Sequence, residues 1–141
     1  MSQSIVIAVD GTAASGKGKL ARQLARHFEF GYLDSGSLYR LTAYGVIRSG
    51  GDPSDEAAAI LAARSIDTSH IGDRAIRSAA VGNAASVVAA FSAVRDVLIE
   101  FQRKFATTFP GVCIDGRDIG TVVCPKASQA ICRCEARGSC A

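Results

Sequence analysis

The stretch IVIAVDGTAASGKGK, at residues 5–19, decides the fold that this sequence predicts. It begins with a short apolar run that ends in an acidic residue and a glycine, a pattern typical of a strand buried on both faces of a sheet. Beyond this run, Leu20, Leu24 and Phe28 recur at spacings of four, which places them on one face of a helix. A strand, a small-residue turn and a helix in this order favour an α/β fold.

The turn between this strand and helix has the G-x-x-x-x-G-K spacing of a phosphate-binding P-loop. Glycines let the backbone turn tightly and approach a phosphate, and the backbone amides then form a nest for an anion. The helix adds its positive N-terminal end, and the lysine can reach the β- and γ-phosphates of a nucleotide. The alternative is a small-residue turn without a ligand, which the lysine at the start of the helix disfavours. We therefore expect nucleotide phosphates to bind at Gly11, Thr12, Ala13, Ala14, Ser15, Gly16, Lys17, Gly18 and Lys19.

The residues after Lys17 depart from the usual motif. That motif continues with Ser or Thr, whose hydroxyl contacts Mg²⁺, whereas this chain has Gly18 and Lys19. Lys17 and Lys19 lie about 200° apart around a helix, so we expect Lys19 to point away from Lys17. The missing hydroxyl predicts weaker binding of Mg²⁺ and nucleotide than a threonine would give.

The remainder of the chain alternates short apolar runs with helical patterns. We expect strands at 31–34 and 112–114, a helix capped by Ser35, helices at 55–63, 79–90 and 94–105, and an irregular polar segment at 67–74. This order predicts a parallel sheet flanked by helices, in which ligands bind beyond the carboxyl ends of the strands. Since Gly11, Asp34 and Asp115 each follow such an end, we expect them to share one cleft.

Composition and charge narrow the function further. A chain of 141 residues forms one domain at most, and a net charge of +3 is too small to indicate a nucleic-acid partner. The first residues lack the features of a signal peptide, and no segment is long and apolar enough for a membrane span, so we expect a cytoplasmic protein. The odd number of five cysteines and the expected cytoplasmic location argue against a disulfide framework, and the absence of a histidine near the cysteines in the sequence argues against a metal site. We expect Phe101 and Phe105 in the core, and His27 and His70 at the surface.

Three further segments make the P-loop pattern specific. They are YLDSGSLYR at 32–40, NAASVVAAFSAVRDVL at 83–98 and IDGRDIGTVVCP at 114–125. Together with GTAASGKGK at 11–19, their order and spacing resemble the bacterial cytidylate kinase family over roughly residues 5–125. The resemblance implies a P-loop nucleoside monophosphate kinase fold and transfer of the γ-phosphoryl group of ATP, with Mg²⁺, to CMP or dCMP. We expect these small molecules as partners and a monomeric chain.

The resemblance also implies roles for individual residues. Asp34 and Arg40 would face the CMP phosphate, with Ser35 in the same substrate site. The residues that would recognise cytosine and its surroundings are Ser86, Arg95, Asp115 and Asp118, and Arg117 would lie near the phosphates. Because this chemistry needs positioning and charge neutralisation and no dedicated base, Lys17, Arg40 and Arg117 are the expected catalytic residues.

Each of these residues also has an ordinary structural interpretation. Arg95 lies on the polar face of an amphipathic helix, where most arginines face water, and Ser86 suits close packing in an alanine-rich helix. Asp34 and Ser35 could form only a helix cap, and Asp115 with the following glycine only a turn. The joint match of all four segments favours the functional roles.

The last residues depart from the family. We expect a P-loop kinase core at 1–125, with a short CMP-binding insert at about 41–80, and an aberrant tail at 126–141 without a clear strand. Family members continue with a strand, an arginine-bearing lid and final elements. Codons for the tail displaced by one nucleotide can encode Lys-Leu-Tyr-Val followed by Pro-Glu-Val-Arg-Ala, as the family has next. We therefore hypothesise a frameshift.

Two rival functions follow. One is a truncated, non-catalytic relic that at most binds nucleotide, because loss of a central strand would expose a sheet edge and apolar surface. The other is a different P-loop small-molecule kinase, such as an adenylate kinase, against which the DGRDIGT and NAAS segments argue.

Overall fold

The computed structural model describes residues 4–11, 16–116, 119–124 and 129–133. These residues divide into two compact units. One unit comprises the described residues of Met1–Ser35 and Gln102–Ala141, and the other is Gly36–Phe101. In the part of the chain that is described, no helix has both the length and the hydropathy of a membrane span.

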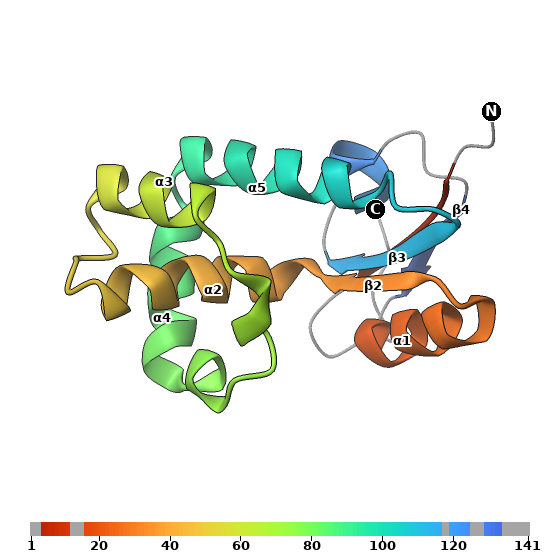
Figure 1. The fold of residues 1–141 in the computed structure, drawn as a ribbon, viewed down its shortest axis with the longest axis horizontal. Helices are drawn as coiled ribbons and strands as arrows, with labels where there is room; N and C mark the ends of the chain where they lie inside the picture. Colours follow the sequence, from red (N-terminus) through yellow and green to blue (C-terminus); the bar gives the residue numbers. More distant parts are fainter. Residues whose placement is uncertain (1–3, 12–15, 117–118, 125–128, 134–141) are drawn as a thin grey trace. The chain divides into compact units, whose positions relative to one another are not determined.

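The first unit is built on a parallel sheet, as the sequence predicts (Figure 1). Its strands are β1 (Ile5–Gly11), β2 (Gly31–Asp34), β3 (Gly111–Gly116) and β4 (Gln129–Arg133), and they lie in the order β2-β3-β1-β4. β1 therefore has a parallel partner on each side. Every residue of β3 is buried, which explains why its sequence is an uninterrupted apolar run until Asp115.

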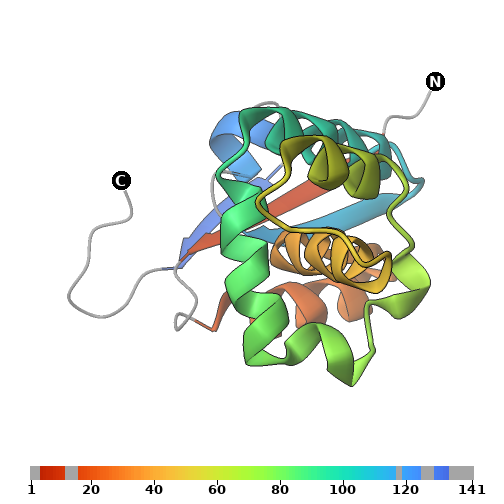
Figure 2. The ribbon, with the colours of Figure 1, turned by 90° about the vertical axis from the view of Figure 1, so that its left-hand side faces the viewer.

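Strand β4 corrects the expectation that the tail contains no strand. It pairs in parallel with β1, from Ile7 opposite Gln129 to Gly11 opposite Arg133 (Figure 2). The sequence signal was weak because QAICR has only three apolar residues in a mixed context. β1 presents a row of backbone hydrogen-bonding groups on this side, and a segment with a weak strand pattern can still form a strand by pairing with them.

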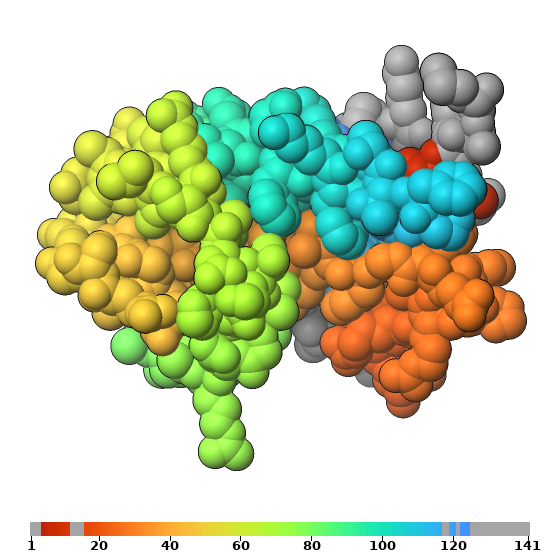
Figure 3. Space-filling model, viewed as in Figure 1, coloured from red at the N-terminus to blue at the C-terminus, as the bar shows by residue number. Residues whose placement is uncertain are grey.

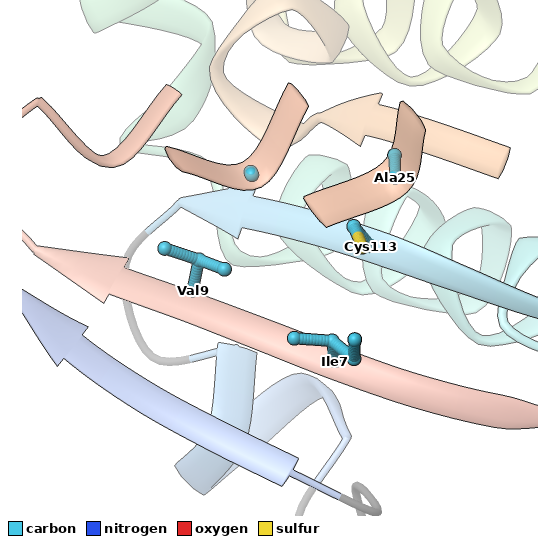
Figure 4. Packing of buried hydrophobic residues seen from close by; sticks show 5 residues of the cluster. Ile7, Val9, Ala25 and Cys113 are labelled. Carbon is cyan, nitrogen blue, oxygen red and sulfur yellow. The ribbon is translucent and has the colours of Figure 1, made fainter. Parts of the chain in front are cut away.

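Helix α1 (Lys17–Phe28) packs on the sheet through small residues. Ala21 and Ala25 of α1 are buried with Cys113 of β3 and with two residues of β1, Ile7 and Val9 (Figure 4). Leu20 and Leu24 are only partly buried at the margin of this cluster. The helix is confirmed, but its most buried face is the alanine face, which allows a close approach to the strands.

Phe28 lies outside the core that its spacing predicts. It is 49% exposed, and its ring stacks on that of Phe30 with 5.5 Å between centroids. Helix α1 ends at this residue, and Glu29 follows with a positive φ of 57°.

The second unit is helical. It contains most of α2 (Ser35–Arg48) and α5 (Ser92–Phe105), together with α3 (Glu56–Arg64) and α4 (Ala79–Ala89). Asp55 and Ser78 cap α3 and α4, because their side chains accept bonds from the amides of Ala57 and Val81. The fully buried side chains of this unit include Leu38, Ile76, Val88, Val94 and Leu98.

Two details differ from the prediction. The segment 67–74, expected to be irregular, holds the 3₁₀ turn η1 (Thr68–His70), and the 3₁₀ turn η2 (Arg74–Arg77) begins at its last residue. Most residues of both turns lie at the surface of the unit (Figure 3, lime green), while Ile76 is buried. Ser35 was expected to cap α2, but the helix begins with Ser35 itself, whose side chain is buried against the sheet end. The Ser35 side chain packs against Gly116 at the end of β3.

Gly111 at the start of β3 gives a first test of this packing. A Cβ there would lie 2.7 Å from the Ile5 carbonyl oxygen and 2.8 Å from the Phe30 ring. We expect Gly111→Ala to lower the free energy of unfolding by roughly 2 kcal/mol, as overpacking typically does. Urea unfolding measures this, with Gly72→Ala as the control because no atom lies within 4 Å of its added Cβ. Equal stability of the two variants would contradict the described packing.

Candidate active site

The P-loop joins the end of β1 to the start of α1. β1 ends at Gly11 and α1 begins at Lys17, while the predicted phosphate contacts Thr12, Ala13, Ala14 and Ser15 lie outside the described residues. Gly16 precedes α1 with a φ of 78°, in the left-handed region that favours glycine. The first turn of α1 carries no acidic side chain, so its amides and its positive dipole end remain suited to an anion.

Lys17 forms an ion pair with Asp115 from the end of β3. Their Nζ and Oδ1 atoms are 3.6 Å apart, and the two side chains are 17% and 1% exposed. Lys19 is exposed, as expected for a side chain on another side of α1. The P-loop lysine therefore lies against a buried carboxylate, at the edge of the sheet where the strands end.

Asp115 has two further polar neighbours, both from β2. Tyr32 donates its phenolic proton to Oδ2 of Asp115, and Asp34 lies directly opposite Asp115 in the strand register. Burial raises the pKa of Asp115, and the negative charge of Asp34 raises it further, while the bond from Tyr32 and the charge of Lys17 act against this rise. Burial also raises the pKa of Tyr32, and its bond to the carboxylate adds to the rise.

Two glycines keep this region compact. A Cβ at Gly116 would lie 1.9 Å from Oγ of Ser35, so the end of β3 and the start of α2 meet without room for a side chain. A Cβ at Gly18 would lie 3.6 Å from Oδ2 of Asp115, which is ordinary contact distance. Gly18 thus places the backbone of α1 directly over the carboxylate.

Asp10 is a site residue that the sequence analysis missed. Its carboxylate accepts hydrogen bonds from the amides of Ile119 (2.6 Å) and Gly120 (2.9 Å), which begin the π-helical turn η3 (Ile119–Val123). Arg103 donates to the carbonyl oxygens at the other end of this turn. An aspartate before a glycine at a strand end is easily taken as part of the P-loop motif. The residues around Asp10 in the sequence do not indicate hydrogen-bond partners more than a hundred residues away.

The helical unit holds the remaining described candidates. Arg40 donates from Nη1 to the Ile76 carbonyl oxygen at 2.9 Å, and its guanidinium packs on Gly82, where a Cβ would lie 3.2 Å from Nη1. Ser86 is exposed and donates to the Gly82 carbonyl oxygen at 3.4 Å. Arg95 is exposed and donates to the Ala89 carbonyl oxygen at 3.0 Å.

His70, which was expected at the surface, is 33% exposed and has polar neighbours. Its Nδ1 lies 2.7 Å from Asp73, and its Nε2 lies 3.3 Å from Nη1 of Arg48. These contacts join the turn η1 to the end of α2. The described residues contain no group of three His, Cys, Asp or Glu side chains that could hold a metal ion.

A comparison with protein families matches residues 7–132 to the model described as cytidylate kinase. The chain belongs to the cytidylate kinase family. Curated relatives named cytidylate kinase include those of Nitrobacter winogradskyi, 50% identical over 127 residues, and Rhodopseudomonas palustris, 53% identical over 127 residues. The relative from Rhodospirillum rubrum is 52% identical over 131 residues. Each comparison covers 90% of this chain, which spans only about 60% of the length of these relatives.

Membership of the cytidylate kinase family confirms the predicted family and fold class. The match extends to residue 132, beyond the limit near 125 that the sequence segments indicated, and it includes most of β4. Within the first unit the structure brings together Lys17, Asp34 and Asp115, and it sets Ser35 against Gly116. Arg40, Ser86 and Arg95 lie in the other unit, and Arg117 and Asp118 lie outside the described residues.

The raised pKa of Asp115 predicts how stability changes with pH. The folded state binds the proton of Asp115 more tightly than the unfolded state, so this contribution is present below pH of about 4 and is lost as pH rises through the folded pKa. We expect Asp115→Asn to gain stability relative to the wild type as pH rises from 4 to 7, measured by urea unfolding. Asp52→Asn is the control, since bonds from Ser54 lower the pKa of Asp52 and predict the opposite trend. A gain that does not depend on pH would contradict this assignment.

Proposed function

We propose that the chain transfers the γ-phosphoryl group of ATP to CMP or dCMP. The observation that carries this proposal is the ion pair of Lys17 with Asp115, which lies at the carboxyl end of the sheet with Asp34 opposite Asp115. A P-loop lysine and strand-end carboxylates at one edge of a parallel sheet suit a site where a donor phosphate and an acceptor meet. The curated relatives named cytidylate kinase support the choice of acceptor.

The chain's own residues would act by positioning and charge neutralisation. Backbone amides at the start of α1 and the Lys17 ammonium would hold the donor phosphates, and the Arg40 guanidinium would hold the acceptor phosphate. Asp34 and Asp115 would orient the acceptor by accepting hydrogen bonds. Mg²⁺, when bound with ATP, would neutralise charge on the phosphates. Since Lys19 stands where a hydroxyl is usual, we expect this chain to bind Mg²⁺ and ATP more weakly than a threonine variant.

Cytosine recognition rests on residues that are proposed from the resemblance. Ser86, Arg95, Asp115 and Asp118 would recognise the base, and Arg117 would act near the phosphates. The oxygens of Ser86 and of the two aspartates can accept from the exocyclic amine of cytosine, a group that uracil lacks, and polar groups left unpaired by an analogue disfavour its binding.

The proposal is tested by measuring ADP formation with CMP, dCMP, UMP or AMP on the purified chain. We expect turnover that depends on CMP or dCMP and exceeds that with UMP by at least tenfold, as polar recognition of an exocyclic group allows. Binding of ATP without turnover would favour the non-catalytic relic, and preference for AMP would favour an adenylate kinase. The presence of β4 removes the missing central strand as a reason for the relic. The frameshift remains a prediction, which the nucleotide sequence of the gene decides.

Gly82 allows the role of Arg40 to be tested without changing a charge. An added Cβ would press on the guanidinium at 3.2–3.5 Å, so Gly82→Ala should displace Arg40 by a few tenths of an ångström. We expect the KM for CMP to rise roughly tenfold with the KM for ATP unchanged, because small misplacements of a positioning group are costly. Thermal unfolding serves as the control, since alanine favours a helix by about 1 kcal/mol over glycine and should not lower stability. Equal changes in both KM values would exclude a specific role of Arg40.

A further inference from the structure

Tyr32 begins the segment YLDSGSLYR, but neither the motif nor the resemblance gives it a role. It lies within β2, and its hydroxyl donates to Oδ2 of Asp115, while Nζ of Lys17 lies 3.6 Å from Oδ1 of the same carboxylate. The two oxygens of this buried carboxylate thus face two different donors, and the side chain of Asp34 interacts with the same carboxylate. One donor belongs to the sheet, and the other is the lysine of the P-loop.

The side chain of Tyr32 is partly buried and contacts both the sheet and α1. Its ring packs against the core cluster of the sheet and α1, and the guanidinium of Arg22 lies 5.9 Å from the ring centroid. A Cβ at Gly18 would lie 3.9 Å from the Tyr32 hydroxyl, so the hydroxyl faces the first turn of α1. Lys17 instead has a long, flexible side chain, whose ammonium group can reach more than one anion.

We propose that Tyr32 is a positioning residue that holds Asp115 in place, so that Asp115 keeps Lys17 at the P-loop until a phosphate chain takes the lysine over. The proposal rests on the proposed function only in assigning the P-loop to phosphates. When Lys17 moves to a phosphate, Asp115 would keep the bond from Tyr32. A buried carboxylate left without a donor would be costly, so this bond makes the exchange of Lys17 possible.

The exchange predicts a link between phosphate binding and pH. Protonation of Asp115 weakens its hold on Lys17, so affinity for a phosphate chain should rise as pH falls through the pKa of Asp115. Burial raises that pKa and the bond from Tyr32 counteracts the rise, so removing the hydroxyl should move the change to higher pH. Among the described residues, Asp34 on β2 and Arg22 on α1 are the other charged groups near Asp115, and the carboxylate of Asp10 on β1 is bonded to η3.

The test measures binding of inorganic tripolyphosphate to the whole chain by calorimetry from pH 5 to 8, without Mg²⁺ or CMP. We compare the wild type with Tyr32→Phe, Asp115→Asn and the double variant, and use Tyr44→Phe as the control. Ionisation of tripolyphosphate is the same for all proteins, so differences between variants belong to the protein. We expect Tyr32→Phe to move the pH profile upward by about half a pH unit or more, as loss of one hydrogen bond to a carboxylate would.

Asp115→Asn should bind tripolyphosphate about fivefold more tightly at pH 8, because the competing charge is gone, and should show a flatter profile. In that background Tyr32→Phe should change the affinity less than twofold, since coupled residues are not additive. A space-filling role of Tyr32 would instead give the same change in both backgrounds and would overturn the proposal. An unmoved profile in Tyr32→Phe, or a wild type that does not bind tripolyphosphate, would overturn it too.

If Tyr32→Phe does not fold, a second variant tests the same hydrogen bond. Incorporation of 3-fluorotyrosine in a Tyr39→Phe/Tyr44→Phe background changes only position 32, since the chain has three tyrosines. The fluorinated phenol is a stronger donor, so the profile should move to lower pH, and an unmoved profile would overturn the proposal. Because no acceptor nucleotide is present, this result is independent of whether CMP supports turnover.

Discussion

The rest of the structure depends on the pairing of β1 with a parallel strand on each side. β1 lies between β3 and β4, so its backbone groups are satisfied within the sheet and its apolar residues can be buried on both faces. The same pairing brings the carboxyl ends of β1 and β3 level, with Asp10 opposite Gly116 and Val9 opposite Asp115. The P-loop leaves the sheet at the point where the carboxylate arrives from β3, and their proximity follows from the register.

This register explains why so much of the site could be predicted. Parallel strands end at one edge, so a lysine after β1 and an aspartate at the end of β3 must lie close together once both strands are recognised. The apolar runs and the glycines that follow them are local signals, and they identified both strands. The contact between Gly116 and Ser35 was not predictable, because it depends on the packing of two strand ends and leaves no pattern in the chain.

The predictions for the tail and for Phe28 failed, and Asp10 was missed, because these features depend on residues far away in the sequence. β4 has a weak strand pattern of its own and forms against an edge that β1 provides. Phe28 continues the helical spacing of Leu20 and Leu24 but lies in the last turn of α1, where burial depends on what faces the helix. Asp10 is bonded to amides near residue 120, and such long-range bonds cannot be read from local sequence.

The polar cluster of Asp34, Asp115, Tyr32 and Lys17 at the strand ends does not favour folding by itself. It holds two aspartates on adjacent strands, one of them 1% exposed, and burial of a carboxylate costs free energy unless donors surround it. Tyr32 and Lys17 supply such donors, but an apolar pair would fill the same space without the cost. A costly polar cluster placed beside a P-loop is what selection for binding produces and selection for stability alone does not. The unfavourable charge at Asp115 is therefore itself an argument that this edge of the sheet binds a ligand.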